Sequence, residues 1–221
     1  MMEAIELYEL ALDYYKRNIL LLCLDQKTGI QALERLFPDK LVMPGHIKKI
    51  EHHYKRHGIR NLIAGLVVAT GEVFGKLYSR NRNFELTNCL TDVFNNFHTY
   101  GKVHIIADNY GTVTHINTCL LVAKFCNVKV SKEMLKTKKQ RVEFLKSKKK
   151  WIVFHFLPTH ASWLNQIEIW FGILQRKVIK KGDFESTKDL DNKIMDFMEI
   201  EWNQKNAHPF QWTYKGKVCC A

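Results

Sequence analysis

The chain has 221 residues, of which 46% are hydrophobic and 12% aromatic, and 34 Lys and Arg against 22 Asp and Glu give a formal net charge of +12. This apolar content supplies the core of one domain and, with only 4 Pro and 11 Gly, excludes collagen-like and intrinsically disordered chains. The apolar runs are too short to span a bilayer, and the N-terminus lacks the features of a signal peptide, so we expect an intracellular protein with no membrane partner.

Along the first third of the chain, the hydrophobic pattern predicts strands. Residues 18–25 (NILLLCLD) form an apolar run that predicts a buried strand with Asp25 at its carboxyl end. Residues 26–50 contain helical fragments together with Pro38, Pro44 and Gly45, and they predict a long loop. Residues 61–70 and 72–79 predict two further strands, joined by a tight turn at a Thr-Gly pair.

The remainder of the chain alternates between helical and strand patterns. Apolar spacing predicts a helix over residues 83–99, and residues 102–108 (KVHIIAD) predict a second buried strand that ends in an acid, Asp108. The further predicted elements are helices over residues 116–126, 132–150, 163–180 and 186–203 and a strand over residues 151–156. This order predicts an α/β fold with a mixed central sheet flanked by helices.

The helix predicted over residues 163–180 carries a broad apolar stripe. Ser162 is expected to cap its N-terminus, and Gly182 is expected to end it. Trp163 and Trp170 belong to the stripe and are expected to pack in the core.

The positive charge is concentrated in residues 135–150, which contain seven Lys and one Arg against a single Glu. A local excess of this size favours a polyanionic partner, with nucleic acid first and an anionic membrane surface second, although a solvated helix face would have the same composition. The candidate contacts to DNA are Lys138, Lys139, Arg141, Lys148, Lys149 and Lys150.

Three acids are candidates for chemistry. Asp25 and Asp108 end predicted strands, and sites in open α/β sheets gather at the carboxyl ends of strands. Glu168 lies at the border of the buried face of a predicted helix, where it could also be an ordinary solvent-facing acid. Clustered carboxylates repel one another and need a cation, and hard oxygen ligands select Mg²⁺ or Mn²⁺. Two such ions can activate a water or a 3′-hydroxyl for phosphodiester cleavage or strand transfer.

Several segments resemble one known family. Residues 156–171 (FLPTHASWLNQIEIWF) closely resemble the signature around the third acid of the IS630/Tc1–mariner transposases, which are DDE superfamily endonucleases. Residues 24–33 (LDQKTGIQAL) and 103–111 (VHIIADNYG) resemble the motifs of the first two aspartates. Further similar segments are residues 54–71, 181–190 and 206–213, so that the resemblance extends from about residue 20 to residue 215.

The resemblance implies an RNase H-like fold and an enzyme of DNA transposition, recombination and integration. Members cut DNA at transposon ends and join the freed 3′-hydroxyl to target DNA. The implied catalytic and metal-binding triad is Asp25, Asp108 and Glu168, with two Mg²⁺ or Mn²⁺ ions. Asn109 and Asn165 match the family's motifs and are expected to orient the site. In a bacterium, such a mobile-element protein is expected in the cytoplasm, associated with the nucleoid.

The chain also departs from the family's pattern. We expect a helical extension over residues 1–18, a catalytic domain over residues 19–215 with an atypical insertion around residues 112–135, and a tail over residues 216–221. Since a helix-turn-helix module does not fit before the first strand, DNA-end recognition is expected from a separate chain, and a homo-oligomer is possible. The alternative is an inactive, truncated transposase remnant that retains only DNA binding.

Overall fold

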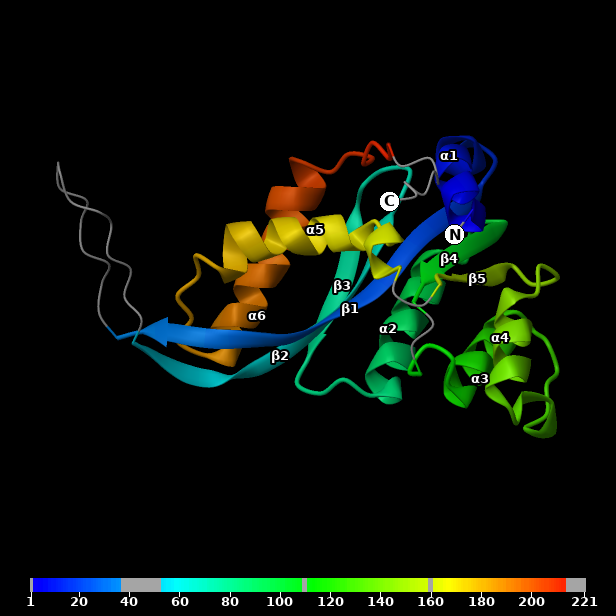
Figure 1. Cartoon of the computed structure of the whole chain (residues 1–221), viewed down its shortest axis with the longest axis horizontal. Coiled ribbons are helices and arrows are strands. Elements are labelled where there is room, and N and C mark those ends of the chain that lie inside the picture. Colours follow the sequence, from blue (N-terminus) through cyan, green and yellow to red (C-terminus); the bar gives the residue numbers. More distant parts are fainter. Residues whose placement is uncertain (1, 37–52, 109–110, 159–160, 214–221) are drawn as a thin grey trace, which may run out of the picture.

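A five-stranded mixed sheet forms the centre of the protein, in a computed structural model that describes residues 2–36, 53–108, 111–158 and 161–213. The strands are β1 (Ile19–Arg35), β2 (Tyr54–Val67), β3 (Val73–Tyr78), β4 (Lys102–Ala107) and β5 (Ile152–Phe156). Their order is β3-β2-β1-β4-β5, with β1, β2 and β3 antiparallel and β1, β4 and β5 parallel (Figure 1). The prediction of a mixed sheet flanked by helices is therefore confirmed.

Within the described residues, six α-helices pack around this sheet. They are α1 (Met2–Lys16), α2 (Asn83–Asn96), α3 (Ile116–Phe125), α4 (Lys138–Lys146), α5 (Ile167–Leu174) and α6 (Thr187–Asp196). The π-helical segments Gln175–Ile179 and Phe197–Gln204 continue α5 and α6, and short 3₁₀ turns lie at Glu133–Leu135 and Ser162–Leu164. The helices predicted over residues 83–99, 116–126 and 186–203 are confirmed, the last with Ser186 as its cap.

The side chains of β1 point alternately to the two faces of the sheet and so belong to two separate core clusters. Leu21 and Cys23 pack with α1, α5 and α6, whereas Leu20, Leu22 and Leu24 pack with α2, α3 and α4. Since successive side chains of a strand point to opposite faces, the two groups of helices cover opposite faces of the sheet at β1. The position of a residue in β1 therefore shows which of the two groups of helices its side chain faces.

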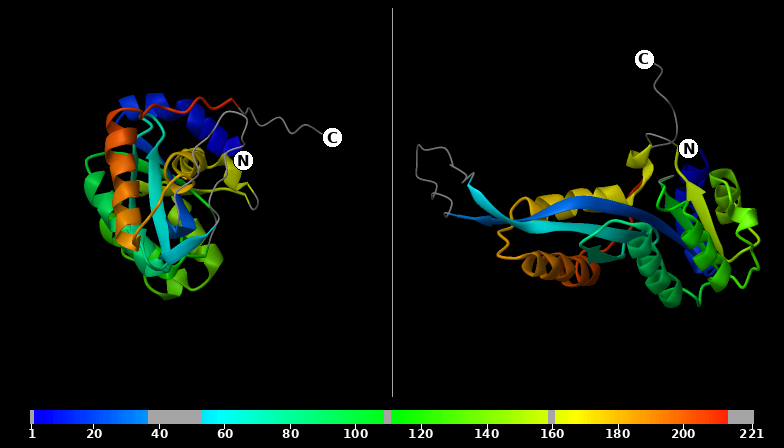
Figure 2. Two further views of the ribbon diagram at one scale, coloured as in Figure 1. Left: turned by 90° about the vertical axis from the view of Figure 1, so that its left-hand side faces the viewer. Right: turned by 90° about the horizontal axis from the view of Figure 1, so that it is seen from below.

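The first strand is much longer than predicted. Residues 26–35, predicted as part of a loop, continue β1 and pair with β2 as far as Arg35 opposite Tyr54. Ile30 and Ala32 are buried against the core, and Gly29 adopts a φ of +73° where the register with β2 shifts. The result is a hairpin arm that extends away from the body of the protein, with α5 and α6 alongside it (Figure 2). The rest of the predicted loop lies outside the described residues.

Two helix predictions need correction. The predicted helix over residues 163–180 begins only at Ile167, because Ser162 and the two residues after it form a 3₁₀ turn without a side-chain cap. Trp163 is consequently 51% exposed, whereas Trp170 is fully buried as expected. The predicted helix over residues 132–150 is reduced to α4, where Thr137 accepts the N–H of Gln140 and so caps the N-terminus.

The N-terminal helix α1 is part of the core. Its buried residues are Ala4, Ile5, Leu7, Tyr8 and Ala11. In the part of the chain that the structure describes, no helix is long and apolar enough to cross a membrane. Residues 112–135 contain α3 and the first 3₁₀ turn, and their status as an insertion relative to the family stays a prediction.

Candidate active site

The first two acids lie side by side where the parallel part of the sheet ends. The parallel pairing of β1 with β4 runs as far as Leu24 opposite Ala107, so Asp25 and Asp108 are the next residues of the two strands. Asp25 is therefore inside the long strand β1 and not at its end, which corrects the prediction. Both aspartates line one cavity of about 220 Å³. The other lining residues are Leu24, Gln26, Thr28, Asn81 and Val113.

Asp25 is fixed by two hydrogen bonds. The backbone N–H of Gln26 donates to its Oδ1 at 2.7 Å, and the Nδ2 of Asn165 donates to its Oδ2 at 3.3 Å. Asn165 is fully buried and also donates to the carbonyl of Leu24 at 3.0 Å. Burial, followed by the charges of Asp108 and Glu168, raises the pKa of Asp25 to about 7 against the opposing effect of the two hydrogen bonds.

Glu168 brings the third carboxylate from the first turn of α5. Its backbone N–H donates to the carbonyl of Asn165 at 3.0 Å, which links the start of the helix to the residue that contacts Asp25. Burial raises the pKa of Glu168, Lys27 opposes this rise, and the charge of Asp108 adds to it. Burial also raises the pKa of Asp108. Asp108 thus acts on both Asp25 and Glu168, and Glu168 acts on Asp25, while a shared catalytic role of the three acids stays a prediction.

Amide oxygens near the acids are the second notable feature. Among the described residues, the Oδ1 atoms of Asn81 and Asn165 are buried without a hydrogen-bond partner, and Asn81 lines the same cavity as the two aspartates. Sequence reasoning missed Asn81, since an Asn in a loop before a helix carries no distinctive pattern. Within the described ranges, no three His, Cys, Asp or Glu side chains stand together as a ready-made metal-binding group.

Helix α1 supports the turn that leads to Glu168. The hydroxyl of Tyr8 donates to the carbonyl of Leu164 at 2.7 Å and lies 3.3 Å from the Sγ of Cys23. Cys23 is buried two positions before Asp25 on the same strand. Tyr8 therefore connects α1 both to the strand that carries Asp25 and to the turn that precedes Glu168. The apolar spacing of residues 4–11 is typical of a helix with one buried face, and it is the feature of the sequence that could have identified Tyr8 as a buried contact.

Two of the predicted contacts to DNA are structural. Lys150 is buried, and its ammonium donates to the carbonyls of Phe144 and Ser147, where it closes the C-terminus of α4. Arg141 donates to the carbonyl of Thr114 at 2.7 Å and to two carbonyls before α4. In this conformation the ammonium of Lys150 and two of the nitrogens of Arg141 donate to backbone carbonyls, and contact of these two residues with DNA stays a prediction.

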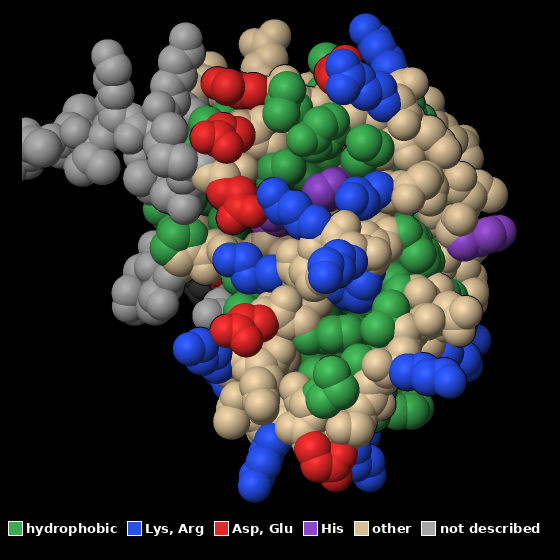
Figure 3. All heavy atoms as spheres, turned by 90° about the vertical axis from the view of Figure 1, so that its right-hand side faces the viewer, with side chains coloured by type: hydrophobic (Ala, Val, Ile, Leu, Met, Phe, Trp, Pro, Cys, Tyr) green, Lys and Arg blue, Asp and Glu red, His purple; other side chains and the backbone are tan. Residues whose placement is uncertain are grey.

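The four remaining lysines, Lys138, Lys139, Lys148 and Lys149, are exposed. The Nζ of Lys102, at the start of β4, donates to the carbonyl of Lys148 at 3.2 Å. Lys148 therefore lies at the amino end of β4, roughly 20 Å along a six-residue strand from the acid at its other end. Lys and Arg side chains gather next to histidine on the face shown in Figure 3. Lys148, near the end of the basic run, is thus separate from the acidic site. Asn109 lies outside the described residues.

The strand order β3-β2-β1-β4-β5, with β2 antiparallel to both of its neighbours and β1, β4 and β5 parallel, is that of an RNase H-like α/β domain. The sequence model of one family, described as DDE superfamily endonuclease, matches residues 21–191. This match covers more than half of the chain, so the chain belongs to the DDE superfamily endonucleases. Together with the strand order, this membership confirms the fold and the family expected from the sequence. A comparison with curated proteins gives no match.

Solved structures of the Mos1 transposase are distantly similar. The Mos1 strand transfer complex is 12% identical with a TM-score of 0.48, and the match covers 90% of this chain and 54% of that chain. The Mos1 mariner paired-end complex with Mn is 15% identical with a TM-score of 0.36, covering 90% of this chain and 59% of that chain. The paired-end complex with Mg is 14% identical, with a TM-score of 0.34 and coverages of 90% and 61%. This chain therefore spans little more than half of the chains that it matches.

Proposed function

We propose that this chain is the catalytic domain of a transposase, which cleaves DNA strands and transfers the freed ends with the help of divalent metal ions. The observation that carries the proposal is the placement of Asp25 beside Asp108, with Glu168 close enough to raise the pKa of Asp25. Membership of the DDE superfamily endonucleases supports the same chemistry.

The donor set fits Mg²⁺ or Mn²⁺. Carboxylates and amide carbonyls are the hard oxygen ligands that these ions take, and the buried Oδ1 of Asn81 has no hydrogen-bond partner among the described residues. Asp25, Asp108 and Glu168 would hold the metal, and bringing Glu168 onto it together with the aspartates is part of the proposal. When bound, a pair of such ions activates the attacking oxygen and stabilises the leaving oxygen of a phosphodiester.

The residues around the acids have positioning roles in this proposal. Asn165 and the N–H of Gln26 each hold one oxygen of Asp25, so that the carboxylate keeps one orientation. Lys27 offsets part of the negative charge that Glu168 experiences. Asn109 follows Asp108 directly and keeps its proposed role in orienting the site.

We extend the proposal to the partners. Transposon ends and target DNA are the substrates, and Lys138, Lys139, Lys148 and Lys149 contact duplex DNA outside the acidic site, where they are exposed. A helix-turn-helix on a separate chain supplies recognition of the ends, and the active assembly is a homo-oligomer.

Nicking of supercoiled plasmid DNA by the purified chain tests the proposal. We expect nicking that requires Mg²⁺ or Mn²⁺, is lost in Asp108→Ala and survives in Asp196→Ala, which removes an exposed acid on α6. Activity in EDTA, or equal activity in Asp108→Ala, would contradict the proposal. DNA binding without any nicking would favour the inactive remnant.

A further inference from the structure

A groove runs between the hairpin arm and the end of α5. It encloses about 410 Å³. One wall is β1 from Lys27 to Arg35 together with Tyr54 of β2, and the other is formed by Gln175, Ile179, Lys180 and Gly182. The groove thus depends on the extension of β1 beyond its predicted end.

The lining of the groove is cationic and polar. Lys27, Arg35 and Lys180 contribute three positive charges, Gln31 and Gln175 contribute amides, and the described lining contains no Asp or Glu. Such a lining attracts a polyanion and offers several hydrogen-bond donors to its oxygens.

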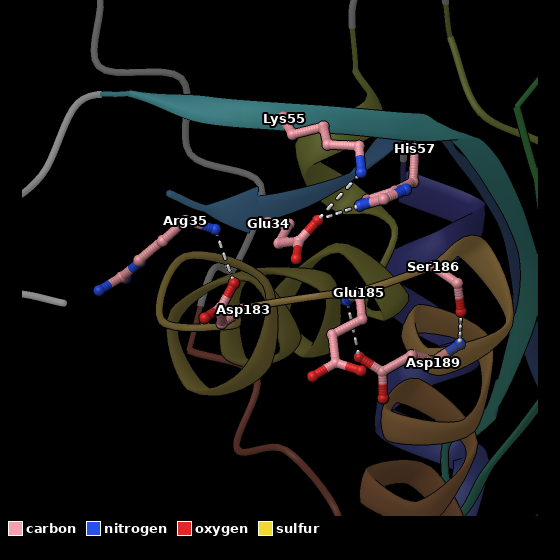
Figure 4. A network of polar contacts seen from close by, with 8 residues as sticks. All are labelled: Glu34, Arg35, Lys55, His57, Asp183, Glu185, Ser186 and Asp189. Carbon is pink, nitrogen blue, oxygen red and sulfur yellow. Dashed lines mark hydrogen bonds and ion pairs between the residues drawn. The ribbon is translucent and has the colours of Figure 1, made fainter. Parts of the chain in front are cut away.

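Two described acids near the arm, Glu34 and Asp183, have hydrogen-bond partners of their own. The Oε2 of Glu34 lies 2.7 Å from the Nε2 of His57 and 3.7 Å from the Nζ of Lys55. The Oδ1 of Asp183 accepts the backbone N–H of Arg35 at 2.8 Å. Figure 4 shows Glu34 next to Lys55 and His57, and Asp183 next to the backbone of Arg35.

One end of the groove meets the acidic site. Lys27 follows Asp25 by two positions and so projects from the same face of β1. It is also the cation that acts on Glu168. A polyanion lying in the groove would therefore pass directly to the three carboxylates.

We propose that this groove binds the sugar–phosphate backbone of a single DNA strand and leads it to the acidic site. The inference rests on the proposed function only in identifying the polyanion as DNA. The volume suits the backbone of one strand rather than a duplex, and Lys27 and Lys180 can each pair with a phosphate of that strand. Lys148, which follows α4, lies at a different part of the surface.

Two groove variants and two matched controls test this inference. Lys180→Gln removes a cation from the groove and Gln31→Glu adds an anion within it, whereas Lys188→Gln and Gln204→Glu make the same changes at exposed positions of α6 and of the π-helical segment after it. Fluorescence anisotropy with a labelled single-stranded oligonucleotide and its duplex, in EDTA and at several salt concentrations, gives the affinities. Melting temperatures equal to that of the wild type confirm that the variants fold.

We expect both groove variants to bind the single strand about fivefold to tenfold more weakly at low salt, and the controls to stay within about twofold of the wild type. The slope of log affinity against log salt should fall by about 0.7 in Lys180→Gln, as for the loss of one phosphate contact on a single strand. Groove variants that match their controls, a wild type that does not bind the strand, or equal weakening on duplex would each overturn the inference.

Nicking assays on the same proteins keep the two proposals apart. If the wild type binds the strand through the groove but does not nick DNA, the groove stands and the proposed function fails. If the wild type nicks DNA and both groove variants bind normally, the groove fails and the proposed function stands.

Discussion

Replacement of Asp25 by Asn should stabilise the metal-free protein. The pKa of Asp25 rises from 3.8 to about 7 on folding, chiefly through burial and then through the two neighbouring acids. At roughly 1.4 kcal/mol per pH unit, this difference opposes folding by about 4 kcal/mol above pH 7. The amide of the variant has one acceptor oxygen instead of two, so one of the two hydrogen bonds would be lost and the other would lose its charge-assisted part, and we expect a net gain of about 2 kcal/mol.

The stability difference between Asp25→Asn and the wild type should depend on pH. Between pH 3.8 and about 7, the folded protein holds a proton on Asp25 that the unfolded chain has released. Stability therefore falls as pH rises through this window, and the loss is complete above pH 7. The Asp25→Asn variant lacks this contribution, so its advantage over the wild type should grow from pH 4 to pH 8.

Thermal unfolding of the wild type, Asp25→Asn and the exposed control Asp196→Asn in EDTA measures the effect. For a chain of this length, about 2 kcal/mol corresponds to a rise in melting temperature of about 4–8 °C at pH 8. Adding Mg²⁺ should stabilise the wild type more than the variant, because ligand binding to the folded state raises stability. A melting temperature of the variant at or below that of the wild type at pH 8, or a difference in melting temperature that does not change with pH, would refute this explanation.

Two further predictions concern the core. The Nδ1 of His104 lies 2.7 Å from the Nε2 of the buried His155, which in turn contacts Glu3. Burial, followed by the charge of His155, lowers the pKa of His104 to about 4. Since the unfolded chain takes up this proton below pH 6.5, the contribution of His104 to stability should fall by about 2 kcal/mol between pH 7 and pH 5, opposite in sign to that of Asp25. In urea titrations, His104→Asn should therefore be more stable relative to the wild type at pH 5 than at pH 7. Trp170→Ala should cost about 3–5 kcal/mol of unfolding free energy and Trp163→Ala about 0.5 kcal/mol, a contrast that similar urea midpoints would contradict.

The strands next to the site could be predicted because their signal is local. The runs that end before Asp25 and Asp108 are apolar enough to be buried on both faces, and parallel strands place their carboxyl ends together. The stretch around Glu168 carries a distinctive motif, so the third acid was identified although the helix that holds it starts later than expected.

Other features depended on contacts between distant segments. The extension of β1 to Arg35 is stabilised by its pairing with β2, and the burial of Lys150 is decided by carbonyls at the end of α4. Trp163 is exposed because the chain makes a 3₁₀ turn, which Tyr8 contacts at the carbonyl of Leu164. The local hydrophobic pattern around β1, Lys150 or Trp163 does not reveal these contacts, because it does not show which other segments will lie beside them.

The sequence by itself determined the three acids, the family, the mixed sheet and the excess of positive charge. Only the tertiary structure decided where that charge lies: Lys148, after α4, is away from the acids, while Lys27 and Lys180 line a groove beside the hairpin arm. The physical reason is that the number of charges is a property of composition, whereas the position of each charge depends on which strand and helix faces are buried against one another.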